Sequence, residues 1–311
     1  MTIVLASAAD RRYGWWLLNL VGSVYANSRA NFDRIVLYDL GLSSMQRRLA
    51  ESIRGAELRS VPPFAPHWSQ SFTWKPWIWT NVDATTVVYL DAGLTVLRSL
   101  DAVVAGIEEH GYFVVSQGKP LADIVPDDYW EPYGVPRELG EREYVAAGIM
   151  GFRKDSLFYE RVIEPTFADC LAGRNLGFSR EDADGLNAGR HRTDDAVVRQ
   201  ACRFRHDQSV LNLRLFSAFR NPVVADLDRF GGYRSDRDHA DQVIWNHRRR
   251  GDLRYLGGVP YRRPLRAIGT LLGLIVRARW WLRLHRWMFR PSTYIGKARR
   301  VMPGLGGGSP R

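Results

Sequence analysis

A single carboxylate, Asp91, follows a run of apolar and aromatic residues at positions 87–90. The run is too short for a helix and suits a strand that is buried on both faces. Asp91 is followed by Ala92 and Gly93, which are small enough for a ligand to approach the backbone. A charged group at the carboxyl end of a buried parallel strand lies where open α/β sheets bind their ligands. The same carboxylate could instead cap the turn that follows, and these ten residues alone do not separate the two interpretations.

Other residues whose side chains could bind a ligand or take part in a reaction occur along the chain, and each also has a purely structural interpretation. Asp10 follows the first apolar run and could bind a ligand or form an Asx-turn. Lys75 stands among aromatic residues and needs either an anionic partner or a route to solvent. Asp207 precedes a helical pattern and could be a ligand or an N-cap. His247 precedes three arginines, which by itself is more typical of a surface residue.

The elements that position these residues follow from the hydrophobic pattern. Strand and helix patterns alternate along the chain, which predicts a mixed, mostly parallel α/β sheet with flanking helices. Strands are expected at 2–6, 34–39, 58–61, 87–90, 112–116, 145–152 and 242–245. Helices are expected at 15–25, 44–54, 100–109 and 156–171, and further helices begin near Lys75 and Asp207. No glycine-rich phosphate loop follows the first strand.

Two long polar segments interrupt this alternation, at 121–142 and 173–193. The first contains Tyr129, Trp130 and Tyr133 together with prolines, and is too long for a plain connection. We interpret it as a functional loop or lid, and expect both segments to set ligand specificity.

The charge of the chain is concentrated near its end. The formal net charge is +11, but residues 261–311 contain 12 Lys or Arg and no acidic residue, which leaves 32 basic groups against 33 acidic ones in residues 1–260. A neutral body argues against a nucleic-acid partner. Cys170 and Cys202 form neither a metal spacing nor a disulfide framework, which favours a reducing, cytoplasmic compartment. We therefore expect residues 1–260 to form the main domain and 261–311 a basic tail.

The tail has the pattern of an amphipathic helix. Arg279, Arg283, Arg286 and Arg290 fall on one helical face, and Trp280, Trp281 and Trp287 lie among the remaining residues. Arginine with tryptophan is typical of a segment lying in an anionic membrane interface. A helix packed on the main domain is the alternative. The uncharged run of the tail, at 267–276, is about half of what a spanning helix requires, so the protein is expected at the inner membrane surface without crossing it.

Taken in order, these segments resemble the GT-A-fold glycosyltransferases, and among them the family 8 type. The resemblance covers roughly residues 2–250. It includes Asp10 and Tyr13 after the first strand, the end of the second strand with Asp39-Leu40-Gly41-Leu42-Ser43, and Lys75. It continues with Tyr89-Leu90-Asp91, Ala147-Gly148-Ile149-Met150, Asp207-Gln208 with Asn212, and His247.

The resemblance implies roles for seven of these residues. Asp10 and Tyr13 would hold the nucleoside of the donor, and Lys75 would lie near its phosphates. Asp91 matches the first carboxylate of the D-x-D motif, which binds Mn²⁺ or Mg²⁺ across the diphosphate, and His247 matches a late histidine ligand of that metal. Asp207 and Gln208 would lie beside the anomeric carbon and act in catalysis.

Two positions depart from the family pattern. The second aspartate of the D-x-D motif is Gly93, and the asparagine expected before Ala147-Gly148 is Ala146. These departures bear mainly on metal dependence.

We therefore expect a glycosyltransferase that moves a sugar from a UDP-linked donor to a lipid-linked or polysaccharide acceptor with retention of configuration. The alternative is a catalytically silent GT-A-like module that binds carbohydrate or nucleotide at the membrane.

Overall fold

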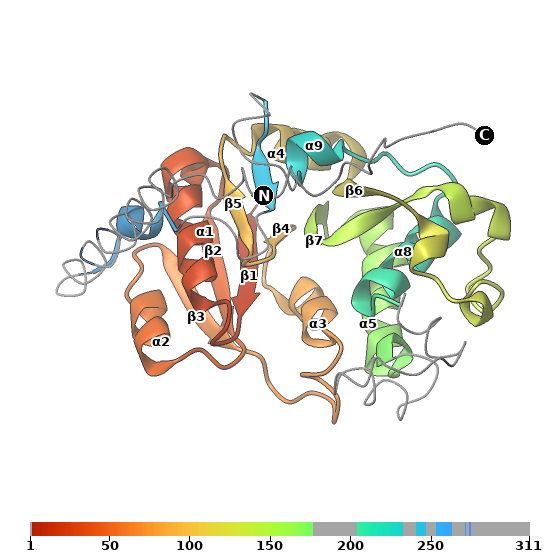
Figure 1. The fold of residues 1–311 in the computed structure, drawn as a ribbon, viewed down its shortest axis with the longest axis horizontal. Coiled ribbons are helices and arrows are strands. Elements are labelled where there is room, and N and C mark those ends of the chain that lie inside the picture. Colours follow the sequence, from red (N-terminus) through yellow and green to blue (C-terminus); the bar gives the residue numbers. More distant parts are fainter. Residues whose placement is uncertain are drawn as a thin grey trace, which may run out of the picture.

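The computed structural model describes residues 2–176, 204–232, 241–246 and 253–262, together with Leu271 and Leu274. Its centre is a six-stranded sheet with the order β3-β2-β1-β4-β7-β6 (Figure 1). The strands are β1 Ile3–Ala9, β2 Arg34–Asp39, β3 Ala56–Ser60, β4 Thr86–Leu90, β5 Leu94–Val96, β6 Tyr112–Pro120, β7 Glu143–Arg153 and β8 Ile244–Asn246. The α-helices are α1 Gly14–Asn27, α2 Ser44–Glu51, α3 Trp74–Asn81, α4 Asp101–His110, α5 Glu164–Leu171, α8 Asp207–Ala218 and α9 Leu227–Phe230.

The strand directions confirm the mixed, mostly parallel sheet. Strands β3, β2, β1 and β4 pair in parallel, whereas β7 lies antiparallel between β4 and β6. Parallel strands are joined by crossovers, so their carboxyl ends share one edge of the sheet. The residues that directly follow β1, β2 and β4 are Asp10, Leu40 and Asp91, and all three lie at that edge.

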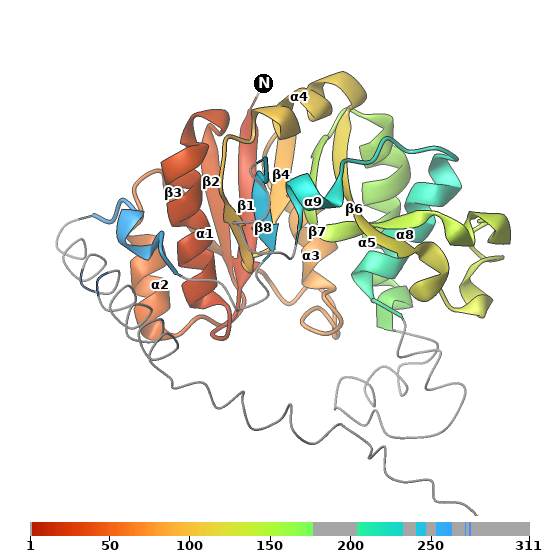
Figure 2. The ribbon, with the colours of Figure 1, turned by 45° about the horizontal axis from the view of Figure 1, so that its top comes forward.

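Both faces of the sheet are covered, because successive strand residues point to opposite sides. On one face, Leu5 and Val88 join a core with side chains of α1, α2 and α4. On the other face, Val87 and Tyr89 join a core with side chains of α3 and α8. Figure 2 shows α1 in front of the sheet, with α4 above it. The face covered by α3 and α8 carries the site described below.

Most predicted elements are confirmed within a few residues, with two differences of physical interest. The predicted helix at 156–171 is divided into a π-helical turn, Tyr159–Ile163, and α5. Pro165 lies at the start of α5 and has no backbone N–H to continue the preceding α-helical ladder. The predicted last strand also lies outside the main sheet, since β8 pairs with β5 in a small separate sheet.

The segment 121–142 is packed more tightly than expected for a lid. Its side chains Leu121, Ile124 and Trp130 are buried in a third core, which includes Leu213 and Phe216 of α8. Three short 3-10 turns interrupt the segment. The segment therefore packs against α8 as part of this third core. The second predicted loop, 173–193, lies outside the described residues beyond Leu176.

The main domain continues slightly past the predicted boundary at residue 260. Tyr261 is buried and forms a bridge with Ile53, and the backbone N–H of Arg262 donates to the carbonyl of Ser52. Apart from Leu271 and Leu274, the predicted amphipathic tail lies outside the described residues. Among the helices that the structure describes, none combines the length and apolar character needed to span a bilayer.

Candidate functional site at the carboxyl edge of the sheet

Asp91 lies at the end of β4 and its carboxylate does not cap the following turn. Its backbone N–H donates to the carbonyl of Gly148 on β7 at 2.8 Å, which fixes the backbone at the sheet edge. Its side chain is 41% exposed, and Oδ1 accepts a hydrogen bond from the Tyr89 hydroxyl at 3.0 Å. Burial raises the pKa of Tyr89 well above its ordinary value, so this hydroxyl remains a donor at neutral pH.

Lys75 is the buried partner of Asp91. It lies in the first turn of α3, and its Nζ is 3.1 Å from Asp91 Oδ1 and 3.3 Å from Asp91 Oδ2. The lysine is only 5% exposed, and its ammonium group lies over the rings of Phe72, Trp74 and Tyr89 at 5.3, 5.7 and 5.7 Å. Lys75 therefore has anionic partners inside the protein and does not extend to solvent.

The second carboxylate at Lys75 comes from Asp207, the first residue of α8. Its Oδ2 is 3.5 Å from Lys75 Nζ, and this buried oxygen accepts no hydrogen bond within the described structure. Burial raises the pKa of Asp207, the charge of Asp91 raises it further, and Lys75 opposes both effects. Burial alone would lower the pKa of Lys75, but the two carboxylates outweigh burial and raise it. We call Lys75, Asp91 and Asp207 the site cluster.

Asp10 and Tyr13 lie in the turn between β1 and α1, beside the site cluster. Asp10 Oδ1 accepts hydrogen bonds from the backbone N–H groups of Arg12 and Tyr13, at 2.8 and 3.0 Å. This Asx-turn engages one oxygen of the carboxylate and shapes the loop. A side chain added at Gly93 would meet only the ring of Tyr13, 3.9 Å from its Cβ. The structure thus brings the β1–α1 turn next to the position of the missing second aspartate.

Gln208 is held against β7 rather than against Lys75. Its side-chain N–H group donates to the carbonyl of Val145 at 2.9 Å. Asn212, one turn later on α8, donates to the same carbonyl at 3.0 Å and accepts from the Val145 N–H at 2.7 Å. Together these amides attach the start of α8 to the sheet, which places Asp207 opposite Lys75.

The predicted metal site is only partly covered by the described residues. His247 lies outside them, and β8 ends one residue earlier at Asn246, which pairs with Leu94. Among the described residues, no three His, Cys, Asp or Glu side chains come together as a metal site. Asp91 is the one predicted ligand present, and a lysine ammonium already contacts both of its oxygens. Asp91 by itself, within the described part of the chain, does not supply a divalent site, because hard cations need several oxygen ligands.

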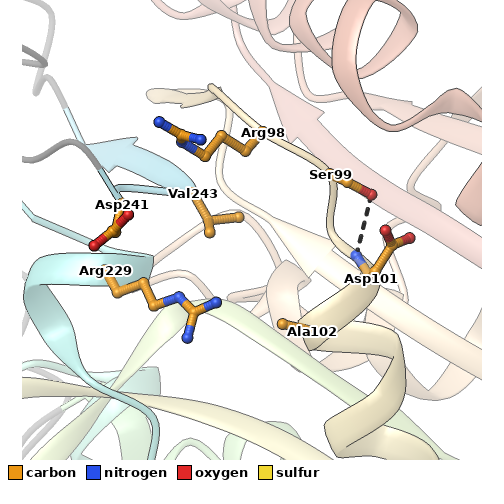
Figure 3. Close-up of a pocket in the computed structure, with 7 residues that line it drawn as sticks. All are labelled: Arg98, Ser99, Asp101, Ala102, Arg229, Asp241 and Val243. Atoms are coloured by element: carbon orange, nitrogen blue, oxygen red, sulfur yellow. Dashed lines mark hydrogen bonds between the residues drawn. The ribbon is translucent and has the colours of Figure 1, made fainter.

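A surface cavity of about 520 Å³ lies elsewhere, around the start of α4 (Figure 3). Arg98, Asp101, Arg229 and Asp241 line it together with small and apolar residues. Its two arginines and two aspartates balance in charge, so the cavity favours no ligand of one sign. None of the predicted site residues lines it, and the chemistry of the site cluster makes the sheet edge the better candidate.

The resemblance includes Tyr89 and Gly148, but sequence reasoning predicted no contact of either residue with Asp91. The hydroxyl of Tyr89 reaches back to the carboxylate two positions later. Gly148 lies directly opposite on β7, and any side chain there would overlap Asp91 Oδ2. A glycine within a strand of small residues is a signal of close approach, but only the pairing of β4 with β7 identifies what approaches it.

Comparison with known proteins supports the fold. No protein-family model matches the chain, and no curated protein matches it by sequence. Among solved structures, a bifunctional glycosyltransferase named WbbM is 13% identical, with a TM-score of 0.52 over 86% of this chain and 51% of its own. The galactosyltransferase LgtC is 14% identical, with a TM-score of 0.43 over 78% of this chain and 86% of its own. Mouse xyloside xylosyltransferase 1 is 11% identical, with a TM-score of 0.46 over 80% of this chain and 98% of its own.

The chain thus spans about half the length of the WbbM structure. At such low identities the likeness establishes architecture and not activity. It confirms the fold that the sequence predicts: the described body of this chain has the fold of the GT-A glycosyltransferases.

Proposed function

We propose that the protein is a glycosyltransferase that uses a nucleotide-sugar donor, with UDP as the nucleotide. The observation that carries this proposal is the site cluster at the carboxyl edge of the sheet, where α/β folds bind ligands. A buried carboxylate oxygen without a hydrogen bond, such as Asp207 Oδ2, costs free energy until a hydrogen-bond donor reaches it. A sugar hydroxyl is such a donor.

The residues of the cluster would divide the work of sugar transfer. Lys75 holds two carboxylates within one site despite their mutual repulsion. Asp207 lies deepest and would accept a sugar hydroxyl and stabilise positive charge that develops at the anomeric carbon. Asp91 is partly exposed and would face the phosphate end of the donor. Asp10 and Tyr13 would contact the nucleoside, and Gln208 would keep α8 in place and present its amide to the sugar. Retention of configuration follows from the family 8 resemblance.

A divalent cation, Mn²⁺ or Mg²⁺, is proposed to arrive with the nucleotide rather than to occupy the free protein. Asp91 and His247 would hold it, and it would neutralise charge on the departing diphosphate. We expect calorimetry to show weak Mn²⁺ binding to the free protein and tighter binding when UDP is present. Gly93→Asp should strengthen Mn²⁺ binding without UDP, because that position has room for a side chain and would add a second carboxylate. Tight binding to the unmodified free protein would contradict this proposal.

The direct test of the proposed function is release of UDP from a series of UDP-sugars, with Mn²⁺ or with a chelator. We expect slow hydrolysis of at least one donor, and loss of hydrolysis in Asp207→Asn. A catalytically silent binding module is the second candidate, and Gly93 in place of the second aspartate favours it. A protein that binds UDP-sugars and never releases UDP, with or without glycan acceptors, would support that candidate.

The acceptor is proposed to be a lipid-linked glycan or a polysaccharide, used at an anionic membrane surface that the basic tail binds. Each arginine near such a surface contributes about 1 kcal/mol. Deletion of 264–311 should therefore abolish salt-sensitive co-sedimentation with anionic vesicles, and leave UDP-sugar hydrolysis nearly unchanged. Equal sedimentation of the full and shortened chains would reject membrane binding by the tail. Loss of hydrolysis would show instead that the tail packs on the main domain.

A further inference from the structure

Strained backbone surrounds the site cluster on two sides. In the part of the chain that the structure describes, the non-glycine residues with positive φ are Ser71 (47°), Phe72 (59°) and His206 (53°). Phe72 lies three residues before Lys75, and His206 directly precedes Asp207. Left-handed backbone is rare for bulky residues, and it persists where surrounding structure enforces it, most often at functional sites. The strained residues therefore lie next to Lys75 and Asp207 in the site cluster.

One buried asparagine holds both strained segments. Asn175 is fully buried, and its side-chain N–H groups donate to the Ser71 carbonyl at 3.0 Å and to Thr73 Oγ1 at 2.8 Å. Its backbone carbonyl is 3.0 Å from Nδ1 of His206. These contacts keep the turn before α3 and the turn before α8 together.

The strained turn before α3 leaves the ring of Phe72 at the surface instead of burying it. Phe72 is 49% exposed, although its ring lies 5.3 Å from the buried Lys75 ammonium. The centroids of the Trp74 and His206 rings lie 6.3 and 6.2 Å from its own. A half-exposed aromatic ring next to a lysine and two carboxylates offers a flat apolar face beside strong hydrogen-bonding groups.

A pyranose ring matches this combination. One face of a pyranose presents C–H groups with partial positive charge, and these are attracted to the negative face of an aromatic ring. The hydroxyls around the same sugar are donors for carboxylate oxygens such as Asp207 Oδ2. An apolar ligand would leave that oxygen without a hydrogen bond, and an anion without a bound cation would be repelled by the net negative charge of the site cluster.

We propose that Phe72, flanked by Trp74 and His206, is the stacking platform for a pyranose ring of the acceptor. The assignment to the acceptor rests on the proposed function. The nucleoside would lie at Tyr13, which is next to Gly93 and hence at the Asp91 end of the site cluster. Phe72 and His206 lie at the Lys75 and Asp207 end, where the transferred sugar would meet the sugar that receives it, and the exposed Phe72 ring faces the acceptor side.

The test is saturation-transfer NMR with three probes, the methyl pyranosides of β-glucose, β-galactose and α-mannose, each with and without UDP. We expect at least one probe to receive saturation from the wild-type protein. The signal should fall about tenfold in Phe72→Ala and in Phe72→Leu, which keeps apolar bulk but lacks the ring face. Phe72→Trp should retain it. Leu157→Ala removes a side chain of similar exposure, 54%, and should leave the signal unchanged. Thermal unfolding of each variant checks that it is folded.

The outcomes separate this inference from the proposed function. Equal signals in wild type, Phe72→Ala and Phe72→Leu would overturn the platform, as would the absence of any signal from a wild-type protein that binds UDP. Displacement of the probe by a UDP-sugar, but not by UDP, would assign the platform to the donor sugar and overturn the acceptor assignment. A Phe72-dependent signal in a protein that does not bind UDP would support the platform and reject the proposed nucleotide.

Discussion

Helix α8 carries two ion clusters with opposite charge balance. At its first residue, Asp207 shares Lys75 with Asp91, so one cation serves two carboxylates. Two turns later, Arg214 forms a bidentate pair with Asp169 of α5 at 2.6 and 2.8 Å, and Arg174 adds a contact at 3.2 Å. We call this second group the α5–α8 cluster. There, two cations serve one carboxylate.

The difference between the clusters lies in hydrogen bonding. Both oxygens of Asp169 accept hydrogen bonds from Arg214, and the guanidinium group also lies 4.8 Å from the centre of the Tyr133 ring. In the site cluster, Asp207 Oδ2 accepts none. A completed cluster fixes two helices together, whereas an incomplete one retains an acceptor that a ligand can use. The comparison teaches that burial of charge alone does not mark a candidate site, and that a carboxylate oxygen without a hydrogen bond at the sheet edge does.

The largest effect should follow removal of Lys75. Lys75→Met leaves a buried carboxylate without its cation, which costs about 3–5 kcal/mol of unfolding free energy. Asp169→Asn should cost only about 1–2 kcal/mol, because the side chains of Arg174 and Arg214 are 52% and 28% exposed and can turn to water. Urea unfolding of both variants measures the two costs. Equal costs would contradict the distinction between the clusters.

The pH dependence of Lys75→Met sharpens the same point. Burial already raises the pKa of Asp207 above its ordinary 3.8, and loss of Lys75 removes the charge that opposes this rise. Above about pH 4 the Asp207 carboxyl then keeps its proton in the folded state and loses it in the unfolded state. The free energy of unfolding should therefore fall as pH rises from about 4 through the raised pKa of Asp207. Lys75→Met/Asp207→Asn should lack this slope. A flat profile for the single variant would show that Asp207 has another partner.

The second prediction concerns catalysis. Asp91→Ala should lower the kcat of UDP-sugar hydrolysis by about 10²–10³-fold and weaken UDP binding, since it removes the carboxylate proposed to hold the cation at the diphosphate. The fold should survive, because the Asp91 side chain is 41% exposed. Asp169→Asn should leave the rate unchanged once corrected for the folded fraction. Wild-type turnover in Asp91→Ala would reject the site, and failure to fold would favour a structural role for this carboxylate.

A third, smaller effect on kcat should differ between substitutions at the two glycines beside Asp91. Gly148→Ala places a methyl group against Asp91 Oδ2 and should reduce kcat by about 10–10²-fold by displacing the carboxylate. Gly93→Ala meets nothing closer than the Tyr13 ring at 3.9 Å and should change kcat little. Steady-state kinetics of the two variants, with unfolding temperatures as controls, tests the geometry. Similar losses in both would mean that Gly93 is needed for a reason other than space.

The smallest effect concerns the strain next to the site cluster. Phe72→Gly should be more stable than Phe72→Ala by about 1 kcal/mol, because both lose the ring but only glycine accepts φ of 59° without strain. Comparing these two variants cancels the lost ring contacts. The α5–α8 cluster has no such strained residue on the described part of α5 or α8. If the two Phe72 variants are equally stable, the turn before α3 stores no strain.

Local patterns were sufficient for much of the fold. The apolar run at 34–39 predicted β2 at the bounds that it has, and the run ending at Leu90 predicted β4 and placed Asp91 at the ligand edge. The turn with Asp10 and Tyr13 was also predictable, since Asp10 acts on backbone groups only two and three residues away. Periodicity reports which local face of an element is buried, and an Asx-turn is closed within one loop, so neither depends on distant parts of the chain.

The composition of the site cluster was decided only by tertiary structure. Lys75 and Asp207 are far apart in the sequence, and each had a plausible solitary role, as a lysine reaching solvent or as a helix cap. They meet because α3 and α8 cover the same face of the sheet, where water is excluded and each charge is stable only with the other. The same long-range packing turned 121–142 from an expected lid into part of a core, forced the left-handed turn at Phe72, and set Gly148 against Asp91. Sequence determined which segments could form strands and where a carboxylate would end one, while the meeting of distant surfaces determined which charges and rings became a site.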